Sequence, residues 1–192
     1  MISGYDWFQP SDLQNFFHAL QKATQPAILV GGQSLTFWVD YFKIPVPKSD
    51  TPYLTQDADV LATKRDARII AAELHGTLNI PTPGDHTPNT AVVTYSTPDG
   101  RTLFVDFMGS LIGLTNEEIR RTAVELEHPK YGFIRILHPT LVLKSRIVNL
   151  LAFNPSVTPM VLSRHAWPCR LQMHFSRTLF HWDWPEQNLT AI

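Results

Sequence analysis

Asp57 and Asp59 are the residues whose type and spacing most directly suggest chemistry. They alternate with Ala58 and Val60, so an extended backbone turns both carboxylates to one face of a sheet and both apolar side chains to the other. Carboxylates at that spacing, about 6 to 7 Å apart, repel by roughly 2 to 3 kcal/mol at an effective dielectric constant near 20. The pair is therefore expected either to share a cation or to lie in water on an edge strand.

A third aspartate, Asp106, lies in a segment that predicts a β-hairpin. Two β-rich runs, Ala91–Ser96 and Thr102–Met108, flank the turn sequence Pro98-Asp99-Gly100. Asp106 interrupts the second run, which is otherwise strongly apolar. A carboxylate buried without a partner costs several kcal/mol, so its presence there favours a functional role.

A glycine pair stands at a predicted junction between a strand and a helix. The apolar run Ala27–Val30 predicts a strand buried on both faces, Gly31-Gly32 ends it, and Ser34–Phe42 has helical spacing of apolar residues. Glycine amides can approach a phosphate closely because no Cβ intervenes, and a helix N-terminus favours negative charge. Such a turn on its own is more often only structural.

The remaining segments complete an α/β (α+β) pattern, with a mixed sheet flanked by helices. Capping boxes are predicted at Ser11 with Gln14 and at Thr115 with Glu118, and Gly76 is predicted to stop a helix. The further helices are expected at 11–24, 64–75, 115–127 and after His138-Pro139, and the further strands at 53–62, 78–81 and 133–137.

In this order of elements the chain resembles the nucleotidyltransferase superfamily, whose fold is shared by DNA polymerase β. It is most similar to AbiEii-type bacterial nucleotidyltransferases, which are often paired with an antitoxin. The likeness covers about Ile28 to Leu151. The residues that match are Gly31, Gly32, Ser34, Asp57, Asp59, Asp106 and, after the His138-Pro139 entry, Lys144.

The resemblance implies transfer of a nucleoside monophosphate from a nucleoside triphosphate (NTP) to an acceptor at a two-metal magnesium site. Asp57 and Asp59 would hold the metals, and Asp106 would complete a metal shell or deprotonate the acceptor hydroxyl. The glycine amides and Ser34 would contact phosphates, and Lys144 would offset the triphosphate charge, with Arg146 as its competitor for that role.

The acceptor is left open between RNA, a protein hydroxyl and a small molecule. A possible antitoxin partner follows from the resemblance and makes a toxin-like role an expectation. The alternative function is a non-catalytic nucleotidyltransferase-like binding module in a toxin–antitoxin or defence pair. A weaker alternative is a metal-dependent phosphohydrolase that uses the same aspartates.

Composition bounds these interpretations. The 192 residues are 44% hydrophobic and 17% charged, which is typical of a globular chain, and the net charge of -1 gives no general attraction to polyanions. A single cysteine, Cys169, excludes an internal disulfide. With no apolar N-terminal or membrane-spanning run, we expect a cytoplasmic protein that does not bind membranes.

The character of the sequence changes after Asn154, where tryptophan and histidine occur without a clear period. We therefore expect a nucleotidyltransferase-like core over residues 1–153 and an atypical tail over 154–192. Our hypothesis for the tail is a truncated or frame-shifted end.

Overall fold

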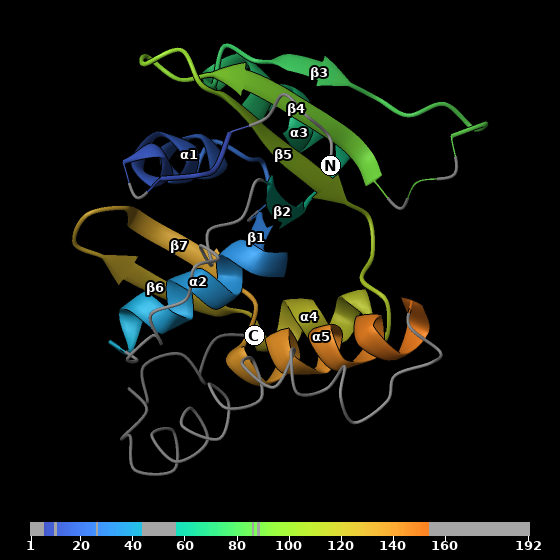
Figure 1. The fold of residues 1–192 in the computed structure, drawn as a ribbon. Helices are drawn as coiled ribbons and strands as arrows, with labels where there is room; N and C mark the ends of the chain where they lie inside the picture. Colours follow the sequence, from blue (N-terminus) through green and yellow to red (C-terminus); the bar gives the residue numbers. More distant parts are fainter. Residues whose placement is uncertain are drawn as a thin grey trace. The chain divides into compact units, whose positions relative to one another are not determined.

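The computed structural model describes part of the chain and gives it a mixed α/β architecture (Figure 1). The described residues are 6–9, 11–25, 27–43, 57–85, 87 and 89–153. The chain divides into two units after Phe153. The second unit, and with it the expectation of an atypical tail, lies outside the described residues.

Five helices and seven strands make up the described part, which confirms the predicted fold class. The helices are α1 (Asp12–Leu20), α2 (Gly31–Tyr41), α3 (Lys64–Glu73), α4 (Asn116–Thr122) and α5 (Pro139–Phe153). The strands are β1 (Ile28–Leu29), β2 (Asp57–Leu61), β3 (Thr77–Asn79), β4 (Asn89–Ser96), β5 (Thr102–Met108), β6 (Val124–His128) and β7 (Gly132–Ile136). None of these helices has the length and apolarity needed to cross a membrane.

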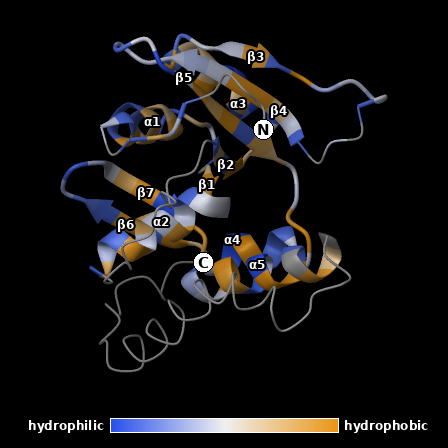
Figure 2. Cartoon of the chain, viewed as in Figure 1, coloured by the Kyte–Doolittle hydropathy of each residue, from blue (hydrophilic) through white to orange (hydrophobic). Residues whose placement is uncertain are grey.

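The strands form one sheet in the order β3-β4-β5-β2-β1-β7-β6 (Figure 1). β2 lies at its centre, parallel to β5 and antiparallel to β1. The alternative in which Asp57 and Asp59 lie on an exposed edge strand is therefore wrong. β4 and β5 pair as the predicted antiparallel hairpin, and β1 is buried on both faces as expected and is coloured as hydrophobic in Figure 2.

The predicted helix over 115–127 is too long. α4 ends at Thr122, and Val124–His128 forms β6, which pairs antiparallel with β7. Alternate residues of β6 are half-buried and exposed, the period-two pattern of a strand with one face packed. The tertiary pairing with β7 thus determines the structure of a segment that also has helical propensity.

Two helix ends are capped differently from the prediction. The Ser11 side chain makes no cap hydrogen bond on α1, so that capping box does not form. At the end of α3 the residue in the left-handed conformation is His75, with φ of 50°, rather than Gly76. The Gly76 and His75 amides donate to the carbonyls of Ala71 and Ala72, the pattern of a Schellman motif.

Position 76 requires a glycine because of packing rather than backbone conformation. A Cβ on Gly76 would lie 2.9 Å from the Thr94 carbonyl oxygen and from a methyl of Val93. The end of α3 thereby packs directly on β4, on the face that carries Val93 and Tyr95. Side chains alternate along β4 and β5, so this face is opposite the one that carries Asp106.

The start of α3 is tied to the segment before β1 by a buried carboxylate. Asp66 is fully buried and accepts hydrogen bonds from the Thr24 amide and hydroxyl at 2.8 and 2.7 Å and from the Thr63 hydroxyl at 2.5 Å. The Thr63 hydroxyl in turn accepts from the Asp66 amide, which closes a capping box. Burial raises the pKa of Asp66, but these hydrogen bonds outweigh it and hold the pKa below its usual value.

We predict that Asp66→Ala lowers the free energy of unfolding by about 2 to 4 kcal/mol, because it removes a cap and leaves the Thr24 donors without an acceptor. Since the folded pKa is lowered, the stabilisation is present above the unfolded pKa and is lost as the pH falls through the folded value. Urea titrations at pH 7 and at about pH 3 measure this. Equal stability of the wild type and the variant at pH 7 would contradict it.

Candidate metal centre

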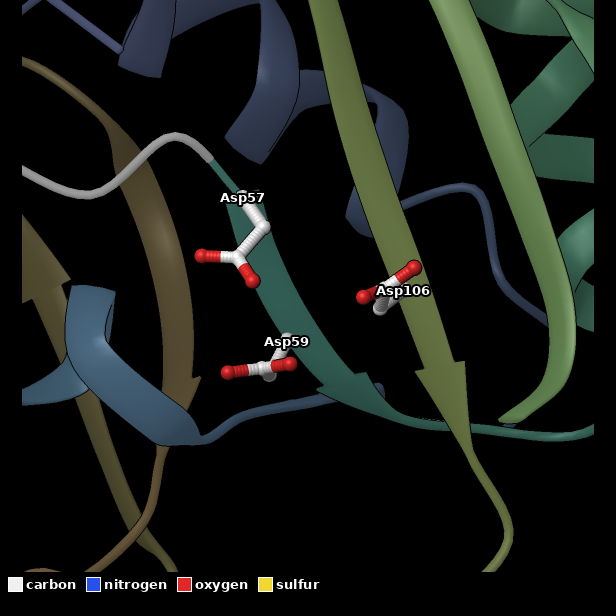
Figure 3. A group of neighbouring side chains, drawn as sticks. All are labelled: Asp57, Asp59 and Asp106. Carbon is white, nitrogen blue, oxygen red and sulfur yellow. The ribbon is translucent and has the colours of Figure 1, made fainter. Parts of the chain in front are cut away.

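The register between β2 and β5 places three carboxylates on one face of the sheet. Asp59 pairs directly with Asp106, and Asp57 pairs with Phe104, two residues earlier on both strands. Figure 3 shows Asp57 and Asp59 projecting from β2 and Asp106 from the neighbouring β5. The three acids predicted from the sequence therefore converge, although Asp57 and Asp106 are separated by about 50 residues in the chain.

One carboxylate oxygen from each of Asp57, Asp59 and Asp106 lies within 4.8 Å of the other two. Three such oxygens are the ligands that hard divalent cations such as Mg²⁺ prefer, and a soft metal would select sulfur or imidazole instead. Among the described residues no other group of three acids, histidines or cysteines is close enough to hold a metal ion. The donor set therefore fits a hard cation.

The raised pKa of Asp59 indicates that the negative charge of the three acids is not compensated. Its pKa is raised to about 6, first by burial and then by repulsion from Asp57 and Asp106. The charge of Arg146 and the Gly32 amide act in the opposite direction and do not compensate. A divalent cation between the acids would lower this pKa, because it favours the charged form of each carboxylate.

Asp106 is half-buried, and its pKa is also raised, first by burial and then by the charge of Asp57. The side-chain amide of Asn89, at the start of β4, interacts with this carboxylate and lowers the pKa. Asn89 was not predicted as a site residue. Its only sequence signal was a polar residue at the end of a loop, and the pairing of β4 with β5 that brings it near Asp106 is a tertiary feature.

Gly31 creates the space that Asp59 occupies. It has φ of +62°, and a Cβ on it would lie only 1.7 Å from the Asp59 Oδ2 atom. Any other residue here would displace the carboxylate. α2 begins at Gly31 rather than at Ser34, so the glycine pair forms the first turn of the helix and presents its positive N-terminal end to Asp59.

Three residues predicted to contact phosphate thus have other neighbours in the structure. The Gly32 amide acts on Asp59, and Gly31 is packed against the same side chain. Ser34 is fully buried, and its hydroxyl donates to the Gly31 carbonyl at 2.7 Å. In this arrangement the turn positions a carboxylate and the start of α2.

α2 is held in place by aromatic contacts at its middle. The Trp38 indole N–H donates to the Leu137 carbonyl at 2.9 Å, which ties the helix to the end of β7. The Phe37 ring meets that of Phe17 edge-on, with centroids 6.2 Å apart. These buried contacts fix the N-terminus of α2 beside the acids.

Lys144 and Arg146 on α5 occupy different environments. The Lys144 Nζ atom lies 2.8 and 3.2 Å from the two carboxylate oxygens of Glu118 on α4. Arg146 acts electrostatically on Asp59 and forms no ion pair with another described residue. Of the two cations, Arg146 is therefore the one associated with the acids.

Comparisons of the chain with protein-family models, with curated proteins and with solved structures find no match. The resemblance to nucleotidyltransferases therefore stays a prediction that rests on the residues themselves.

We predict that Asp59→Asn raises the free energy of unfolding of the metal-free protein by about 1 to 3 kcal/mol at pH 7. A carboxylate whose folded pKa is raised destabilises the fold above about pH 6 and ceases to do so as it is protonated. The free energy of unfolding of the wild type should therefore rise as the pH falls from 7 to 5, and that of the variant should rise by a smaller amount. Denaturant titrations with a chelator present measure this, and an unchanged or lower stability of the variant at pH 7 would count against it.

Proposed function

We propose that the protein is a metal-dependent nucleotidyltransferase that moves a nucleoside monophosphate from a nucleoside triphosphate to an acceptor hydroxyl. The observation that carries this proposal is the convergence of Asp57, Asp59 and Asp106 on one face of neighbouring strands, beside the N-terminus of a helix. The order of strand, glycine turn, helix, paired acids and third acid adds support through the resemblance to that superfamily.

In this proposal Asp57, Asp59 and Asp106 hold Mg²⁺. The metal would supply positive charge to the phosphate oxygens, on which negative charge builds during transfer. The acceptor oxygen bonds to the α-phosphorus, the bond to pyrophosphate breaks, and the hydroxyl proton is taken up at Asp106.

Arg146 is assigned to the triphosphate in preference to Lys144. Its guanidinium can bind two phosphate oxygens at once, and it is not engaged by an acid of α4 as Lys144 is. A toxin-like role and an antitoxin partner are carried by the resemblance alone, and the acceptor stays open between RNA, protein and a small molecule.

The test is incubation of the full chain with cell extract, Mg²⁺ and NTPs labelled at the α-phosphate. We expect label to appear in an acceptor fraction and to fall at least about 100-fold in Asp57→Ala, Asp59→Ala and Asp106→Ala, since each change removes a metal ligand. Circular dichroism of each variant verifies that the loss is not due to unfolding.

Other outcomes assign other functions. If NTPs bind without any transfer, and bind equally to the wild type and the aspartate variants, the protein is a binding module rather than an enzyme. Release of free phosphate without labelled acceptor would indicate a phosphohydrolase.

Arg146 and Lys144 offer a matched pair on one helix. We predict that Arg146→Ala weakens NTP binding at least about tenfold, because it removes a cation whose charge acts on Asp59, whereas Lys144→Ala changes it less than about threefold. Equilibrium dialysis with labelled NTP measures both. If Lys144→Ala has the larger effect while both variants remain folded, the assignment of Arg146 is wrong.

A further inference from the structure

Asp106 is the one acid of the candidate metal centre that belongs to β5, and it is half-buried. The side-chain amide of Asn89, on the neighbouring strand β4, donates a hydrogen bond to its carboxylate. A carboxylate has two oxygens, so a hydrogen bond to one of them fixes the group and leaves the other for a metal ion. Asn89 reaches this carboxylate through an irregularity in β4.

The register between β4 and β5 shifts by one residue beside Asn89. Ala91 pairs with Phe107, but the next residue of β5, Met108, pairs with Asn89 rather than with Thr90. Thr90 is therefore the extra residue of a β-bulge. Such bulges are frequent beside active sites, where they change the direction of a side chain.

The bulge turns Asn89 to the face of the sheet that carries Asp106. Val92 pairs with Asp106 and shares its face. Asn89 lies three residues before Val92, and in an unbroken strand this odd spacing would place it on the opposite face. Because the bulge adds one residue, Asn89 pairs with Met108, two residues from Asp106 on the same face. Diagonal neighbours of this kind lie about 7 to 8 Å apart, and the two polar side chains bridge that span with one hydrogen bond.

Two hydrogen bonds and a glycine support the bulge. The Thr90 hydroxyl donates to the Phe107 carbonyl at 3.0 Å, and the Asn89 backbone amide donates to the Thr87 hydroxyl at 3.2 Å. A Cβ on Gly109 would lie 2.8 Å from the Thr90 methyl group, so the glycine leaves room for the extra residue. The position of Asn89 is thus determined by the structure on both strands.

We propose that Asn89 is a positioning residue of the metal centre, and that its amide holds the Asp106 carboxylate with one oxygen directed towards Asp57 and Asp59. This inference rests on the metal site of the proposed function and adds to it a residue that does not bind the metal itself. Asp106 comes from a different strand than the other two acids, so its orientation determines whether the three can share one ion. Partners that orient metal ligands in this way contribute about 10- to 100-fold to metal affinity.

The test is the affinity of the full chain for Mn²⁺, measured at neutral pH from the electron paramagnetic resonance signal of the free ion. Asn89→Leu, which nearly keeps the shape of the side chain, and Asn89→Ala both remove the donor. We expect each to weaken Mn²⁺ binding at least about tenfold. Asn89→Gln keeps an amide donor and should bind Mn²⁺ within about threefold of the wild type.

Asn79→Leu is the matched control. Asn79 is exposed on the edge strand β3 and pairs with Val92, so it lies on the same face of the sheet but one strand further from the acids. The same substitution there should leave the Mn²⁺ affinity unchanged. Thermal melting with a chelator present verifies that each variant is folded.

The outcomes separate the role of Asn89 from the metal site itself. Equal affinity of the wild type and the two variants without a donor would overturn the role of Asn89 and leave the metal site intact. Equal losses in Asn89→Leu and Asn89→Gln would also overturn it, because the amide donor would not be the cause. Absence of Mn²⁺ binding to the wild type would instead remove the metal centre, and both the proposed function and this inference with it.

Discussion

The mutual repulsion of Asp57, Asp59 and Asp106 is the constraint on which the site depends. One oxygen of each lies within 4.8 Å of the other two on a half-buried face, and burial together with this repulsion raises the pKa of Asp59 to about 6. The fold tolerates this arrangement because strand pairing fixes the backbone: β2 and β5 are central, parallel and hydrogen-bonded. A hard cation bound between the carboxylates would attract each of them and so offset their mutual repulsion.

The surrounding elements are arranged to keep these carboxylates in place. Gly31 leaves room for Asp59, and the N-terminus of α2 faces that carboxylate. The contact between Trp38 and Leu137 anchors the same helix to β7, while the Asn89 amide acts on Asp106 from β4. Positive potential therefore reaches the acids from a helix end, an amide and Arg146, but the pKa of Asp59 and of Asp106 stays raised.

Local patterns predicted the parts of the fold that local chemistry determines. The turn Pro98-Asp99-Gly100 and the alternation around it predicted the hairpin, and Asp57 and Asp59 were placed on one strand face by period-two spacing. Pairing between distant segments determined the rest. Val124–His128 forms a strand only because β7 lies beside it, and the contact of Glu118 with Lys144 joins two helices that the sequence does not show to be adjacent.

The most direct test of the central claim is a crystal structure of the full chain grown with Mn²⁺ in place of Mg²⁺, with anomalous diffraction used to locate the metal. We expect an anomalous peak for a metal ion bound by carboxylate oxygens of both Asp59 and Asp106, and no peak there in crystals of Asp59→Asn. Side chains of the three aspartates turned apart, or a peak elsewhere with this face empty, would contradict it.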